Sequence, residues 1–157
     1  MLAAMEVKEL GHLVLYVRDI DRSSAFYADV LGWKKIEMPG DGPLGRMPVA
    51  AFTSGRTHHE LLLIEVGEDA QPLPAGRHLG LYHFGLKVGD SDDELRAAVH
   101  RIQEAGVRIV GLSDHTVSHS LYILDPDGNE IELYIDVPGV DWKNGAAVLA
   151  PVRPLAL

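Results

Sequence analysis

Cysteine is absent from the 157 residues of this chain, which excludes disulfide bonds and thiolate metal ligands. Basic residues are also few, since 14 lysines and arginines face 23 acidic residues, for a formal charge of −9. Nucleic acids and anionic membranes bind basic surfaces, so neither is an expected partner. No apolar run approaches the roughly 20 residues of a membrane helix, and the first residues, which lack a basic segment followed by a long apolar run, are not expected to form a signal peptide. A cytoplasmic protein is therefore expected.

The sequence instead contains an internal repeat. The stretch "GHLVLYVRD" (11–19) matches "YHFGLKVGD" (82–90), which places His83 71 residues after His12. The stretch "ELLLIEV" that begins at Glu60 matches "ELYIDV", and Glu132 lies 72 residues after Glu60. A repeat of this length is too long for a solenoid and indicates a duplicated half-domain.

Each half has the pattern of a strand, a helix and three more strands. The first helix, over 19–32, begins with Asp19 or Asp21 as N-cap, and the second has a capping box formed by Ser91 and Glu94. The glycine-rich segment 39–45 lacks the context of a phosphate loop and is expected to be a turn. We expect one domain over 1–157, with module 1 at about 8–67, a linker at 68–80, module 2 at about 80–136 and a tail at 137–157 that wraps a surface.

Strand alternation places one polar side chain opposite the apolar side chains in four of these strands. In the strand that begins at His83, for example, Phe84, Leu86 and Val88 are expected on the opposite side from His83. The four polar positions are His12, Glu60, His83 and Glu132. If the halves are related by a pseudo-twofold axis, these four side chains converge on one face.

Three stretches, "GHLVLYVRDIDRSSAFYADVLGW", "YHFGLKV" and "DPDGNEIELY", resemble the vicinal oxygen chelate superfamily over about residues 8 to 136. That superfamily includes glyoxalase I, extradiol ring-cleaving dioxygenases, and fosfomycin and bleomycin resistance proteins. Small catechol 2,3-dioxygenase-like proteins are the most similar group. The resemblance implies an α+β fold in which two βαβββ modules form a curved, partly open mixed sheet barrel, with helices on the outer face and a divalent metal in the sheet.

The resemblance also implies metal ligands. His12, His83 and Glu132 match the facial triad of the extradiol dioxygenases, and Glu60 matches the fourth ligand of glyoxalase I. Whether Glu60 is a ligand or a carboxylate that orients a neighbouring histidine is left open by the sequence.

Catalytic residues are implied in the same way. His59 matches a histidine that lies beside the metal ligands in the extradiol enzymes, although strict alternation separates it from Glu60 unless the strand is bulged or His59 lies on its rim. Tyr122 precedes Glu132 by 10 residues, as does an active-site tyrosine of those dioxygenases. Within "SDHTVSHSLY" (113–122), His115 is the expected acid–base histidine, and His119 is the alternative.

Two enzymes and one binding protein remain as interpretations. Three protein ligands on an octahedral metal leave three positions, which suit a catecholate and dioxygen; the metal is then Fe(II) or Mn(II). Four ligands leave two positions, which suit a glyoxalase I-like lyase or isomerase with Ni(II), Zn(II) or Co(II). The third interpretation is a bleomycin-resistance-like binder that is not an enzyme. In each case the partner is a small molecule, and the resemblance implies a homodimer.

Overall fold

The computed structural model describes residues 5–37, 48–143 and 145–157. The glycine-rich segment 39–45 lies outside these ranges. The chain forms two compact units, Met1–Ala70 and Gln71–Leu157, and the boundary between them falls inside the predicted linker. In the described part of the chain, no helix is long and apolar enough to cross a membrane.

The two units have the same sheet topology. The first sheet has the order β1-β4-β3-β2 and the second β5-β8-β7-β6-β9, and in each the first pair is parallel and the others are antiparallel. The strands are β1 (Leu13–Val17), β2 (Lys34–Ile36), β3 (Val49–Thr53), β4 (Leu61–Glu65), β5 (His83–Gly89), β6 (Ile109–Asp114), β7 (Ser118–Leu124), β8 (Glu130–Asp136) and β9 (Arg153–Pro154). The predicted duplication of a βαβββ unit and the α+β class with mixed sheets are confirmed.

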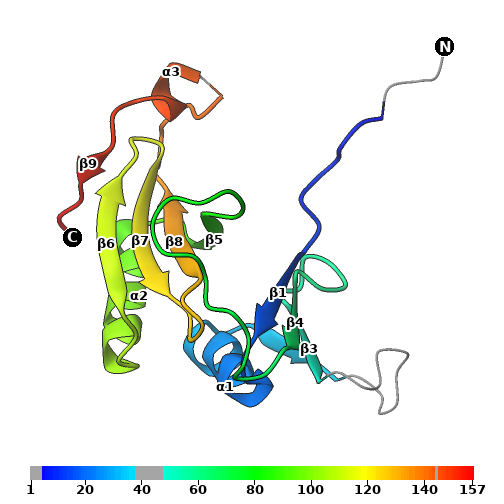
Figure 1. The fold of residues 1–157 in the computed structure, drawn as a ribbon. Coiled ribbons are helices and arrows are strands. Elements are labelled where there is room, and N and C mark those ends of the chain that lie inside the picture. Colours follow the sequence, from blue (N-terminus) through cyan, green and yellow to red (C-terminus); the bar gives the residue numbers. More distant parts are fainter. Residues whose placement is uncertain (1–4, 38–47, 144) are drawn as a thin grey trace. The chain divides into compact units, whose positions relative to one another are not determined.

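Each unit has one principal helical element, which packs on its own sheet. In the first unit, α1 (Ile20–Ala25) continues into one wide turn, η1 (Phe26–Val30), and α1 contacts β3 and β4. In the second, α2 (Asp92–Glu104) contacts β5, β7 and β8 (Figure 1). The short helix α3 (Gly145–Val148) lies in the tail. The helices thus cover one face of each sheet and leave the other for the polar positions.

Both predicted helix starts are confirmed. Asp19 is the N-cap of α1, and its side chain accepts a hydrogen bond from the amide of Arg22 at 2.8 Å. Ser91 caps α2, and the Glu94 carboxylate accepts from the Asp90 amide and the Ser91 hydroxyl, each at 2.8 Å. The wide turn η1 is not indicated by the sequence pattern.

Alternation predicts the core faces with one exception. In β8, Ile131, Leu133 and Ile135 are buried and Glu132 is on the other side, as predicted. The prediction is wrong for Val88, which is 38% exposed. The register of β5 against β8 shifts between Lys87 and Gly89, so a bulge ends the alternation before Val88.

The tail extends the second sheet. Arg153 and Pro154 form β9, which pairs with Asp114 and Ser113 at the edge of β6 (Figure 1). Proline donates no hydrogen bond to a ladder and is found in edge strands, which suits its place here. The expected wrapping of a surface by the tail therefore takes the form of an added edge strand.

Candidate metal and catalytic site

The predicted site residues divide between the two units. His12, His59 and Glu60 belong to the first, while His83, His115, Tyr122 and Glu132 belong to the second. In the part of the chain that the structure describes, no three His, Asp or Glu side chains gather closely enough to hold a metal ion. We therefore describe the geometry unit by unit.

In the first unit, His12 and His59 are neighbours. His12 directly precedes β1, His59 lies two residues before β4, and these strands pair in parallel with Leu13 beside Leu61. The ring centroids of the two histidines lie 4.6 Å apart. Partial burial, and then the charges of His58 and His12, lower the pKa of His59. A neutral imidazole is thereby favoured, the form that accepts a proton or binds a metal.

Glu60 is buried, and its carboxylate is hydrogen-bonded to residues of the preceding loop. Its Oε1 accepts hydrogen bonds from Ser54 Oγ at 2.6 Å and Arg56 Nε at 3.1 Å. Its Oε2 accepts from the Ser54 amide at 2.7 Å and contacts Thr53 Oγ1 at 3.0 Å, although Thr53 Oγ1 also bonds the Thr57 carbonyl. Three donors, together with a hydroxyl whose single proton can go to Glu60 or to Thr57, thus surround a group that offers about four lone-pair directions.

The electrostatics of Glu60 agree with this geometry. Burial acts to raise its pKa, but hydrogen bonds from Ser54 and Thr53 and the charge of Arg56 outweigh that effect, so the pKa lies below its usual value. Glu60 is accordingly an ionised carboxylate whose charge is already compensated within its own loop.

The His59 and Glu60 side chains contact different partners, and no bulge separates them. Both residues precede β4, which begins at Leu61. The Glu60 backbone nevertheless joins the sheet, since its amide donates to Phe52 O and its carbonyl accepts from the Leu13 amide, each at 2.9 Å. The Glu60 side chain contacts the loop over 53–56, whereas the His59 ring contacts His12.

In the second unit, His83 and Glu132 face each other. His83 begins β5, and Glu132 lies in the middle of β8, the parallel neighbour of β5. His83 Nε2 lies 3.2 Å from Glu132 Oε2. Metal bonds of about 2.1 Å at right angles place two donor atoms about 3.0 Å apart. The observed separation, between an imidazole nitrogen and a carboxylate oxygen, therefore fits adjacent ligands of one divalent metal.

Glu132 differs from Glu60 in its partners. Its Oε1 accepts from the buried Ser120 hydroxyl at 2.6 Å and from Tyr122 at 3.1 Å, whereas the polar contact of its Oε2 within the described part of the chain is His83. One oxygen is thus anchored and the other is directed at a potential ligand partner. No arginine or lysine contact to Glu132 is found among the described residues.

Tyr122 and His115 extend this group. Tyr122 pairs with Glu132 in the register of β7 and β8, and its hydroxyl lies 2.7 Å from His115 Nε2. Burial, followed by the charge of Glu132, raises the pKa of Tyr122, which keeps the phenol protonated. When Tyr122 donates to Glu132, its oxygen accepts from His115, which requires the tautomer with a proton on Nε2.

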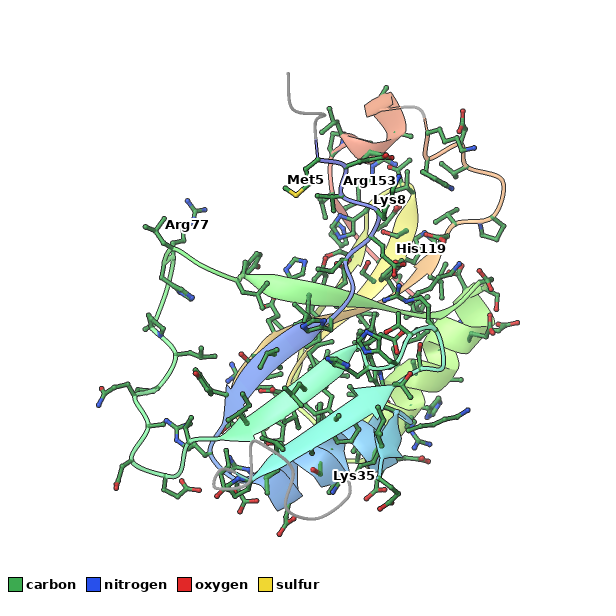
Figure 2. The ribbon with its side chains drawn as sticks, turned by 90° about the vertical axis from the view of Figure 1, so that its right-hand side faces the viewer. Met5, Lys8, Lys35, Arg77, His119 and Arg153 are labelled. Atoms are coloured by element: carbon green, nitrogen blue, oxygen red, sulfur yellow. The ribbon has the colours of Figure 1, made fainter. Side chains whose placement is uncertain are left out.

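The two candidate histidines of the 113–122 segment have different surroundings. His115 Nε2 lies 3.9 Å from Glu132 Oε1, next to Tyr122. His119, labelled in Figure 2, contacts the Asp92 carboxylate at 2.6 Å and thereby links β7 to the first residue of α2. Only His115 is adjacent to the expected ligand set.

Three contributors were not predicted from the sequence. Ser120 anchors Glu132, and alternation from Tyr122 would have placed it on the same face. Gly85 leaves room for the Tyr134 ring, and a glycine inside a strand is a signal of such a close approach. Arg56 contacts Glu60 and the segment before His12, and nothing in the sequence pattern indicates that contact.

Comparisons with known proteins identify the family of this chain. The profile of the Glyoxalase/Bleomycin resistance protein/Dioxygenase superfamily matches residues 9–133. A catechol-2,3-dioxygenase of Bacillus subtilis is 34% identical over 143 residues, which are 91% of this chain and 47% of the relative. The chain thus spans about half the length of that protein.

Shorter relatives match over nearly their whole length. A lactoylglutathione lyase of Neisseria meningitidis is 29% identical over 136 residues, which are 84% of this chain and 94% of the lyase. The crystal structure of a glyoxalase/dioxygenase from Nostoc punctiforme has a TM-score of 0.69 and 25% identity, and covers 87% of this chain and 96% of its own. The chain belongs to the glyoxalase/bleomycin resistance protein/dioxygenase superfamily.

Proposed function

We propose that the chain is a metal-dependent ring-cleaving dioxygenase of the extradiol type, acting on a catecholic substrate. His12, His83 and Glu132 are the proposed metal ligands, one from the first unit and two from the second. Support for this division of roles comes from the contrast between the two glutamates, because the Glu60 carboxylate accepts from Ser54 and Arg56 through both of its oxygens while Glu132 keeps one oxygen beside His83.

Excluding Glu60 from the ligand set favours the dioxygenase. To bind a metal, its carboxylate would have to give up contacts with Ser54 and the charged contact with Arg56. With three protein ligands, half of an octahedral site stays open, which accommodates a bidentate catecholate and dioxygen. One carboxylate also leaves a divalent metal with a net charge of +1, which attracts a catecholate anion.

The proposed metal is Fe(II) or Mn(II). When bound, it supplies the coordination of substrate and dioxygen and the redox chemistry that the protein side chains lack. The tandem of His83 Nε2 and Glu132 Oε2 at 3.2 Å provides two adjacent positions for it.

Proton handling is assigned to His115, with His59 as the alternative. His115 contacts Tyr122, whose raised pKa keeps the phenol protonated. On substrate binding, the single phenol proton would turn from Glu132 Oε1 to a substrate oxygen, and His115 would adopt the tautomer with an unprotonated Nε2. An imidazole in this place accepts the catechol proton and later returns it to the product. In the alternative, His59, whose ring lies beside His12, accepts the catechol proton. Its lowered pKa keeps the imidazole neutral and able to accept that proton.

The face of β1 and β4 that follows His12 suits an aromatic substrate. Val14 is 47% exposed and Tyr16 is 69% exposed on the side opposite the buried Leu15 and Val17. Apolar side chains that continue directly from a proposed ligand offer a surface to the ring of a catechol.

The test is oxygen uptake by the metal-free chain reconstituted anaerobically with Fe(II), measured with a panel of substituted catechols. We expect ring cleavage with the wild type and also, once Fe(II) is saturating, with Glu60→Gln, because Glu60 lies outside the proposed ligand set. Loss of Fe(II) binding in Glu60→Gln, together with no oxygen uptake by the wild type on any catechol, would contradict the proposal.

A second candidate is a glyoxalase I-like lyase that uses Ni(II), Zn(II) or Co(II). One observation favours it: the lactoylglutathione lyase relative is matched over 94% of its length, and the catechol dioxygenase over only 47%. It requires Glu60 to leave Ser54 and Arg56 and bind the metal. Hemithioacetal isomerisation with Ni(II), abolished by Glu60→Gln, would establish this second function.

A further inference from the structure

Arg56 contacts two segments that are far apart in the sequence. Its Nε donates to Glu60 Oε1 at 3.1 Å and its Nη1 to Glu9 Oε2 at 2.9 Å. Its Nη2 donates to the carbonyls of Leu10 at 3.2 Å and Gly11 at 3.4 Å. Every nitrogen of the guanidinium is therefore used.

These two segments each carry a site histidine. Leu10 and Gly11 directly precede His12, while Glu60 directly follows His59, and the two rings lie 4.6 Å apart. The backbones are joined here by one hydrogen bond, from the Leu13 amide to the Glu60 carbonyl at 2.9 Å. Arg56 adds a side-chain connection to the residues just before β1, which begins at Leu13.

The geometry requires an arginine. A guanidinium has donors in a rigid planar fork and can hold a carboxylate and backbone carbonyls at fixed angles, whereas a lysine ammonium is a flexible point charge. The buried Glu60 carboxylate, fixed by Ser54, gives the fork a rigid base. An exposed ion pair on its own would stabilise the fold very little, so the expected effect of Arg56 is on position.

We infer that Arg56, supported by Glu60, is a positioning residue that holds the segment before β1 so that His12 is oriented for metal binding. The inference rests on the proposed role of His12 as a ligand. It also gives Glu60 a function that does not involve direct coordination.

The test is a titration of the metal-free chain of residues 1–157 with Mn(II), comparing wild type with Arg56→Gln and Arg56→Lys. Both variants should bind Mn(II) roughly 10- to 100-fold more weakly, the range for residues that orient metal ligands. Arg96→Gln is the matched control, because it removes another surface arginine paired with an acid, Asp93, on α2. Its Mn(II) affinity should equal that of the wild type.

Hydrogen exchange of the Leu13 amide gives a readout that does not depend on metal. We expect faster exchange in both Arg56 variants, since the chain before β1 is held less firmly, and this measurement applies to Arg56→Lys even if Arg56→Gln fails to fold. Unchanged Mn(II) affinity in Arg56→Lys would overturn the requirement for a fork. Unchanged affinity and unchanged exchange in both variants would overturn the inference.

A parallel titration of His12→Ala separates this inference from the proposed function. If His12→Ala loses Mn(II) while the Arg56 variants keep it, only the positioning role fails. If His12→Ala keeps wild-type affinity, the proposed ligand set fails instead.

Discussion

Two glutamates at equivalent places in the repeat show how local partners decide what a side chain can do. Glu60 is surrounded by Ser54, Thr53 and Arg56, whereas Glu132 is anchored at one oxygen only. The repeat in the sequence predicts that both residues occupy matching positions, but it does not predict their hydrogen bonds. For Glu60 those bonds come from the end of β3 and the loop before β4, and for Glu132 from β7. These segments lie outside the stretches in which the sequence repeat is visible.

Gly85 gives a prediction at the same scale. A Cβ at this position would lie 3.3 Å from Tyr134 Cε1 and 3.6 Å from Glu132 Oε2. Gly85→Ala should therefore displace the Tyr134 ring, bring a methyl group against Glu132 Oε2 and lower Mn(II) affinity several-fold, measured by titration of the metal-free chain.

Gly111→Ala is the control for that substitution. Gly111 lies in β6 of the same sheet, and a Cβ there meets nothing within 4 Å among the described residues. Equal Mn(II) affinity of Gly85→Ala and wild type would show that the close approach of Tyr134 has no bearing on Glu132.

At the scale of elements, periodicity predicts what is local and misses what is distant. The helix starts at Asp19 and Ser91 follow from side chains that bond amides within a few residues. The bulge before Gly89 and the edge strand β9 depend on pairing with β8 and β6, which no local pattern specifies. The contact of Arg56 with Leu10 spans 46 residues, so no local sequence pattern indicates it either.

The cap of α2 permits a stability prediction that is independent of the site. Ser91→Ala removes the acceptor for the Glu94 amide and should lower the free energy of unfolding by about 1 kcal/mol. Urea unfolding measures this loss. Mn(II) affinity should stay at the wild-type value, and a loss of affinity comparable to that of a ligand substitution would contradict the independence of cap and site.

The same cap gives a dependence on pH. The hydrogen bond from the Asp90 amide, and then that from Ser91, hold the pKa of Glu94 below its usual value. A lowered carboxyl pKa stabilises the fold above the unfolded value, near 4.3, and this contribution is lost as the pH falls through the folded pKa. Glu94→Gln should therefore reduce the difference in unfolding free energy between pH 7 and pH 3. An unchanged difference would contradict the lowered pKa of Glu94 in the folded chain.

At the scale of the whole molecule, we propose a homodimer, as the family resemblance implies. Several large apolar side chains outside the proposed substrate surface are exposed in the described residues, among them Leu79, Trp142 and Leu149. Sedimentation at micromolar concentration should give twice the chain mass of 17.1 kDa. A monomer under these conditions would contradict the proposal.

The sequence predicts the architecture of each unit because the repeat sets strand order and faces together, as the matching orders of β1-β4-β3-β2 and β5-β8-β7-β6 show. The candidate site is predictable only as a set of positions. Which oxygen of Glu132 is open, and whether His115 or His119 is next to it, depends on contacts between strands that the sequence does not encode locally.

A metal shared by the two units is tested most directly by Mn(II) titration of metal-free wild type, His12→Ala and His83→Ala, with His100→Ala on the exposed side of α2 as control. We expect one Mn(II) per chain in the wild type and the control. Each ligand variant should lose more affinity than the roughly 10- to 100-fold seen when residues behind the ligands are removed, because the proposal makes His12, from the first unit, and His83, from the second, direct ligands of one ion. Wild-type affinity in either His12→Ala or His83→Ala would contradict a site built from both units.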